Sequence, residues 1–164
     1  MTNSSNINFW HMQLHPNQAE SGEWDRNKIA QILYEENVIG LGQWPEGEHQ
    51  IRQFRDDMNI GDVILIRGDG PIALVQVTGD AEFLEKEFTD DNFDWFENRR
   101  TIKVLGFYQD YKEKLPSKLG KGYWGMTLQK CKEITGSTND INFTIGDYIR
   151  KWFELTRTEE KKSQ

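Results

Sequence analysis

The residues with the clearest chemical potential are Gln43 and Trp44, which end the apolar run 37–44 and precede Pro45. The Trp44 indole can stack on a flat heterocycle, and the Gln43 amide can read that ring's edge because it carries both a donor and an acceptor. Two glycines in the run let a ligand or another backbone approach closely, since they have no Cβ. The alternative is that Trp44 is one core aromatic among six tryptophans. The run alone leaves both interpretations open.

Three stretches have the apolar periodicity of amphipathic helices. The first begins after Asp25, which can cap it, and ends near Asn37; the second covers residues 48–58; Thr144 can cap the third. The apolar positions at helical spacing are Ile29, Ile32 and Leu33, then Ile51, Phe54 and Met58, then Ile145, Tyr148, Ile149, Trp152 and Phe153. The charged tail after Thr156 is expected to fray.

Strands are predicted for residues 7–14, for 38–44 and for 101–108, and residues 63–66 and 72–77 predict a hairpin with a five-residue loop. Residues 126–134 fit a short helix or a strand equally well. The order of strands and helices predicts an α+β fold, with a curved mixed sheet or small barrel and helices outside it. We expect one main domain, residues 1–140, followed by a helix and charged tail, residues 141–164.

Composition limits the function classes. The net charge of −7 does not suit a protein that coats nucleic acid without specificity, so any such binding needs a local cationic patch. No apolar stretch approaches the roughly 18 residues of a membrane span, and residues 1–8 lack a signal pattern, so a cytoplasmic protein is expected. The single Cys131 excludes an internal disulfide and a cysteine-clustered zinc site.

Motifs for enzymatic chemistry are missing or out of context. Residues 120–125 match the dinucleotide pattern G-x-G-x-x-G, but no buried strand precedes them. The sequence has no phosphate-binding loop, no nucleophile elbow and no metal-ligand cluster. We therefore expect no cofactor, no metal and no hydrolytic or redox activity.

Cationic residues in three places are candidates for phosphate contacts. Arg52 and Arg55 fall outside the apolar stripe of the second helix, and Arg99 precedes the last predicted strand. The loop 112–121 holds four lysines, among them Lys114, Lys118 and Lys121, against one glutamate. The alternative for the helix and for the loop is a solvated surface without function.

Several features together resemble the PUA-like superfamily. They are the aromatic pair Phe9-Trp10, the strand that ends in Trp44, the hairpin that enters at Gly61, the return strand 72–77, and Trp95 ahead of the strand 100–108. Within that group, residues 7–130 are similar to EVE and YTH domains and to the N-terminal DNA-reading domains of McrB-type modification-dependent restriction systems. The resemblance implies a non-enzymatic module that recognises a modified base, with methylation as the expected modification, flipped into an aromatic pocket.

The resemblance also assigns roles to residues. Trp44 would form one wall of the pocket. Trp95 would form another, with Phe93 or Phe96 as the alternatives to Trp95. Trp10 and Gln43 would line its floor or edge. A base leaves its stack at a cost of a few kcal/mol, and each aromatic face can return roughly 1–3 kcal/mol. The candidate phosphate contacts would supply the rest.

The implied partner is nucleic acid, DNA more than RNA, within a restriction or defence system that includes a motor or nuclease subunit. Two alternatives stay open. One is an ASCH-like hydrolase of modified nucleosides, which uses a lysine near the pocket; this chain has no lysine between Lys28 and Lys86. The other is a protein-interaction or nucleotide-sensing module that uses the acidic and aromatic segment 80–96 or the final helix.

Overall fold

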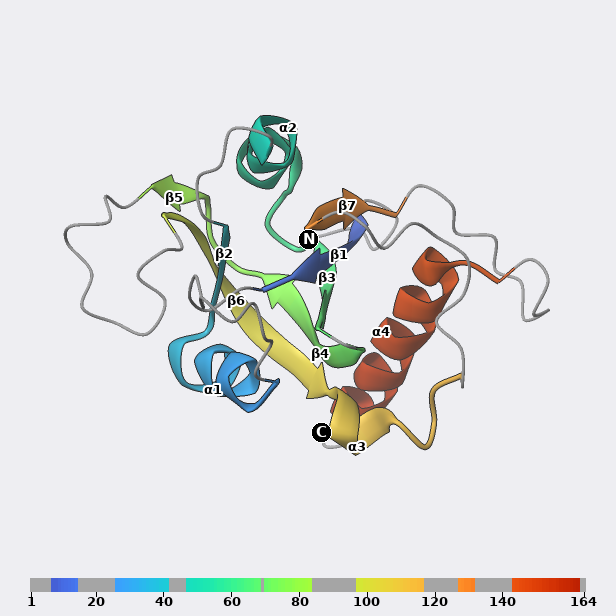
Figure 1. The fold of residues 1–164 in the computed structure, drawn as a ribbon. Coiled ribbons are helices and arrows are strands. Elements are labelled where there is room, and N and C mark those ends of the chain that lie inside the picture. The colour runs from blue at the N-terminus through green and yellow to red at the C-terminus, as the bar shows by residue number, and fades with distance from the viewer. Residues whose placement is uncertain are drawn as a thin grey trace.

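A mixed sheet carries helices on both faces in this computed structural model (Figure 1). The structure describes residues 7–14, 26–41, 47–68, 70–83, 97–116, 127–131 and 143–162. The elements are β1 (Phe9–Gln13), α1 (Arg26–Glu36), β2 (Val38–Leu41), α2 (Glu48–Arg52), the π-helical turn η3 (Gln53–Asp57), β3 (Val63–Arg67), β4 (Pro71–Val77), β5 (Glu82–Phe83), β6 (Asn98–Phe107), α3 (Tyr108–Tyr111), β7 (Leu128–Lys130) and α4 (Ile145–Lys162). The predicted α+β fold, a curved mixed sheet flanked by helices, is confirmed.

The strands follow the order β2-β6-β4-β3-β1-β7, with β5 beside β6. β1 runs parallel to β3, and the other recorded pairs are antiparallel. The predicted hairpin is confirmed as β3 and β4, but its loop is shorter than five residues because Arg67 pairs with Pro71. The stretch that fitted either a helix or a strand contains β7.

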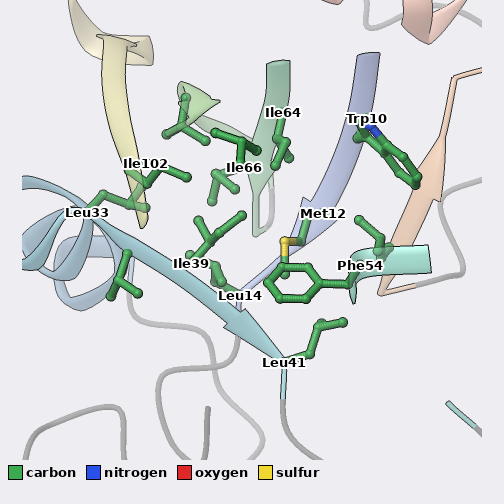
Figure 2. Close-up of a cluster of buried hydrophobic side chains, with 14 of the residues drawn as sticks. Trp10, Met12, Leu14, Leu33, Ile39, Leu41, Phe54, Ile64, Ile66 and Ile102 are labelled. Carbon is green, nitrogen blue, oxygen red and sulfur yellow. The ribbon is translucent and has the colours of Figure 1, made fainter. Parts of the chain in front are cut away.

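The larger core lies between the sheet and the helices α1, α2 and η3 (Figure 2). Trp10 and Met12 of β1 point into it, and Phe54 reaches it from η3. The first two predicted helices are present, since α1 supplies its apolar stripe to this core and α2 continues into η3. The π-helical turn was not predicted. Among the described ranges, no helix has the length and apolar composition that a bilayer span requires.

α4 covers the opposite face of the sheet and forms a second core there (Figure 1). Its fully buried Trp152 packs edge-on against Tyr148, and its Phe153 packs against Phe9 of β1. The predicted cap is present: the Asp147 N–H donates to Thr144 Oγ1 at 3.1 Å, and the Thr144 N–H donates to Asp147 Oδ2 at 3.0 Å. The helix continues past Thr156, where fraying was predicted, to Lys162, and Thr156 itself is buried. The boundary between residues 140 and 141 stays a prediction.

A buried polar pair also lies on the α4 face of the sheet. The Arg67 Nε donates to His11 Nδ1 at 3.3 Å, and both side chains are buried. Burial, followed by the charge of Arg67, lowers the pKa of His11 to about 4, although Gln129 acts in the opposite direction. His11 is therefore neutral at neutral pH and accepts the hydrogen bond from the guanidinium.

This pair predicts a stability loss in mild acid. Because the pKa of His11 is about 4 in the folded chain and 6.5 in the unfolded chain, the unfolded state gains the proton first as pH falls through that window. Urea unfolding should show that the wild type loses about 3 kcal/mol more than His11→Gln between about pH 7 and pH 4. Glutamine keeps an acceptor for Arg67 but does not titrate. Parallel pH profiles would contradict the assignment.

Candidate functional site

Three strands meet where β6 begins. Asn98 of β6 is paired with Leu41, the last residue of β2, on one side and with Phe83, the last residue of β5, on the other. Figure 1 shows β5 beside the start of β6, with the end of β2 nearby. We call this region the β2–β6–β5 end. Gln43 and Trp44 follow Leu41 closely in the chain, and Trp95 precedes Asn98.

Seven of the predicted site residues, five around the base and two lysines, lie beyond the described ranges. The predicted residues concerned are Gln43, Trp44, Phe93, Trp95, Phe96, Lys118 and Lys121. Their assignments stay predictions. Among the described residues, Leu41 and Asn98 form the last recorded pair before these two tryptophan-bearing segments.

Phe83 adds an aromatic side chain that the sequence did not single out for the site. Its ring is 52% exposed, although phenylalanine is usually buried, and it lies at the β2–β6–β5 end. Asn98 beside it is buried and donates from Nδ2 to the Leu41 carbonyl at 3.4 Å. The start of β6 is therefore anchored to β2, while an apolar ring beside it stays open to solvent.

Trp10 does not have the place that the resemblance implies. β1 is an interior strand between β3 and β7, and the Trp10 side chain points into the larger core, where it is 0% exposed. Its indole Nε1 donates to Asp62 Oδ2 at 3.0 Å (Figure 2 shows the ring among its core neighbours). No part of this ring is open to a ligand, so Trp10 is a core residue and not the floor of a pocket.

The basic pair at the start of β6 is also buried. Arg99 is only 8% exposed, between the partners Gly40 and Glu82 on the flanking strands, so it offers little surface to a phosphate. Arg100 donates from Nη1 to the carbonyls of Phe54 and Met58 at 2.9 and 2.6 Å. Burial lowers the pKa of Arg100, and nearby carboxylates partly offset this shift. Arg100 therefore holds the end of η3 against β6.

Arg52 and Arg55 remain exposed on α2 and η3. Each lies near a carboxylate: Arg52 Nη2 is 3.6 Å from Glu48 Oε1, and Arg55 Nε is 3.6 Å from Asp56 Oδ1. Exposed pairs of this kind contribute little to stability, and the guanidinium groups can exchange partners. Arg100 joins η3 to the start of β6. Arg52 and Arg55 therefore lie on the same side of the molecule as the β2–β6–β5 end.

Lys114 lies away from the β2–β6–β5 end. It follows α3 and lines a cleft near Phe107, at the far end of β6 from Asn98. The structure therefore does not bring Lys114 together with Arg52 and Arg55. In the ranges that the structure describes, no group of three His, Cys, Asp or Glu side chains could hold a metal ion.

No protein-family model and no curated protein matches the chain. Among solved structures it is similar to the YTH domain of Zygosaccharomyces rouxii MRB1 in complex with N6-methyladenosine RNA, with a TM-score of 0.49, 7% identity, and 95% of this chain and 90% of that chain covered. It is also similar to protein Atu2648 from Agrobacterium tumefaciens, with a TM-score of 0.48, 15% identity, and 93% and 92% covered. Human THYN1 in complex with 5-methylcytosine-containing DNA gives a TM-score of 0.43, 14% identity, and 77% and 91% covered.

These are likenesses of fold. They include a YTH domain, one of the groups that the sequence resembles. TM-scores below 0.5 at such identities carry no residue role, ligand or activity over to this chain.

Proposed function

We propose that this chain is a non-enzymatic module that recognises a modified base of nucleic acid at the β2–β6–β5 end, with Trp44 and Trp95 as the walls that hold the base. Gln43 would read the edge of the base, and Phe93 or Phe96 would complete the apolar lining. In this proposal the module is the DNA-specificity part of a restriction or defence system, with a motor or nuclease subunit as its partner.

The observation that carries the proposal is the register between β2 and β6. Leu41 is paired with Asn98 and Gly40 with Arg99. Trp44 lies three residues after Leu41, and Trp95 lies three residues before Asn98. The same antiparallel register, extended past the strand ends, would therefore set Trp44 opposite Trp95. Two indoles far apart in sequence would thus occupy matching positions on neighbouring segments.

The end of the ladder suits a base between two rings. Directly opposed residues of paired strands have Cβ atoms about 4.5–5.5 Å apart. A base stacked between two rings needs about 7 Å, which is twice an aromatic contact distance. The proposal therefore requires the two segments to separate by a few ångström beyond the pair of Leu41 and Asn98.

Exposed cations at the same end would supply affinity that does not depend on the base. Arg52 and Arg55 are more than half exposed and lie on the helical segment that η3 and Arg100 join to β6. Phosphate contacts position a nucleic acid and carry no sequence information. The buried Arg99 and the distant Lys114 do not extend this set.

A direct test compares duplex DNA containing 5-methylcytosine, 5-hydroxymethylcytosine or N6-methyladenine with plain duplexes and with matched RNA. Fluorescence anisotropy should show that wild type prefers one modified duplex. Trp44→Ala and Trp95→Ala should each lower that preference by about tenfold, since one aromatic face contributes roughly 1–3 kcal/mol of stacking.

Ile60→Ala is the matched control, because Ile60 is an exposed apolar side chain in the turn before β3. It should leave the preference unchanged, and thermal unfolding should show that all variants stay folded. Equal affinity of wild type for every duplex would refute the proposal. A preference that survives in both tryptophan variants would refute the assigned walls.

A further inference from the structure

An open cleft of about 620 Å³ lies at the other end of β6. It is formed by the end of α1, the last residues of β6, and α3 with the turn after it; Figure 1 shows α1 and α3 flanking this end of the strand. The side chains used below are Tyr34, Lys103, Phe107, Asp110, Tyr111 and Lys114. Cavities of this size hold small organic ligands.

The cleft exists because β2 is shorter than β6. β2 pairs with β6 only from Asn98 to Thr101, and the Ile102 N–H then donates to the Asn37 carbonyl at 2.9 Å. Asn37 has a φ of 53°, which turns the chain from α1 into β2. Beyond Ile102, no strand in the described ranges pairs with this edge of β6. The edge between residues 103 and 107 thus faces the cleft.

Aromatic surfaces line the cleft on two sides. Tyr34 is 73% exposed on α1, and its ring lies 6.5 Å from that of Phe107, centroid to centroid, at an interplanar angle of 48°. The Tyr111 ring lies directly against Gly106, so that any Cβ at position 106 would overlap it. Gly106 therefore allows the ring to lie directly on the strand. The exposed face of Tyr34 is free for a planar ligand to stack on.

The cleft carries more positive than negative described side chains, although the chain as a whole is acidic. Among the described residues that line the cleft, Lys103 and Lys114 contribute two cations against one carboxylate, that of Asp110, whereas the chain has a net charge of −7. An anionic group is therefore favoured here and disfavoured over much of the remaining surface. Asp110 can accept hydrogen bonds from a ribose hydroxyl or a base amino group.

We propose that this cleft binds a nucleoside monophosphate unit, with its base stacked on Tyr34, its phosphate beside Lys103 and Lys114, and a donor group directed at Asp110. The unit can be a free nucleotide or one nucleotide of a bound strand, since both present the same chemistry. On β6 the nearest residue that lines the cleft, Lys103, is separated from Asn98 at the β2–β6–β5 end by about 17 Å of strand. The proposal therefore does not depend on the modified-base reader.

Amide NMR titrations of the full chain with adenosine monophosphate, adenosine and inorganic phosphate test the site. Adenosine monophosphate should give saturable shifts at residues 103–107 and 110–114, and it should bind about tenfold more tightly than either fragment, because stacking and charge act together. Tyr34→Ala and Lys103→Glu should each weaken its binding by about tenfold. Lys151→Glu reverses an exposed charge on α4 and serves as the control, which should not change the affinity.

A further arm compares adenosine monophosphate with a short single-stranded oligonucleotide. Affinities are taken from the shifts at residues 103–107 and 110–114, which report on the cleft alone. Tenfold tighter binding of the oligonucleotide by this measure identifies a strand as the source, and equal binding identifies the free nucleotide; either result supports the site. Equal affinities for inorganic phosphate and adenosine monophosphate would refute it. So would shifts from an acidic extended peptide without any from adenosine monophosphate, because the open edge would then accept a peptide strand. None of these outcomes depends on Trp44 or Trp95.

Discussion

Trp152→Ala is expected to lower the free energy of unfolding by about 3–5 kcal/mol, as for other large-to-small changes in well-packed cores. Trp152 is fully buried at the centre of the second core, where its ring lies 6.2–6.4 Å from those of Tyr108, Tyr111 and Tyr148. Small domains have only about 5–15 kcal/mol of stability, so this change would remove much of it. Urea unfolding followed by circular dichroism measures the loss.

Trp152→Phe is the matched control. The indole Nε1 is buried and has no hydrogen-bond partner in the described part of the chain, so phenylalanine gives up no bond there. We expect this variant to lose clearly less stability than Trp152→Ala, because most of the apolar ring is kept. Equal losses in both variants would mean that the ring contacts do not account for the effect. A small loss in Trp152→Ala would mean that α4 does not complete the core.

Asp62→Ala should have a similarly large effect, with a loss of about 3–5 kcal/mol. The Asp62 carboxylate is 1% exposed and accepts from the Asn8 N–H at 3.1 Å, the Asn59 N–H at 2.9 Å and the Trp10 indole N–H at 3.0 Å. It thereby joins the start of β1 to the turn before β3. Alanine leaves all three donors without this acceptor, and a buried donor without a partner is costly.

Asp56→Ala is the control for this change, since Asp56 is an exposed carboxylate on η3. Its effect should stay within about 0.5 kcal/mol. Asp62→Asn should fall between the two, because the amide keeps one oxygen acceptor but directs an NH2 group at the remaining donors. Thermal and urea unfolding of the three variants give the order. A loss in Asp62→Ala no larger than that in Asp56→Ala would contradict the assigned network.

The elements of the fold could be predicted because their signals are local. The hairpin follows from two apolar runs around a glycine-rich loop, and the stripe of α1 follows from the spacing of Ile29, Ile32 and Leu33. The parallel pairing of β1 with β3 has no local signal, since it joins strands separated by two helical segments. The two-residue strand β5 is too short to have a periodicity.

The candidate site could be predicted only in part, for a different reason. Aromatic and cationic residues are visible in a sequence, but their burial depends on which strands flank them. Trp10 is buried because its side chain projects from the interior strand β1 into the larger core, and Arg99 is buried on a part of β6 that β2 and β5 flank on both sides. The cleft near Phe107 has one sequence signal, the position of Tyr34 outside the apolar stripe of α1.

The interior position of β1 also governs the order in which the molecule can assemble. Trp10 is paired with Lys130, which closes a loop of about 120 residues. During synthesis β1 has no β7 beside it until residues 128–130 have been made, and α4 follows later still. Contacts so distant in sequence slow folding. Chains that stop before β7 should consequently depend more on chaperones than chains that extend through α4.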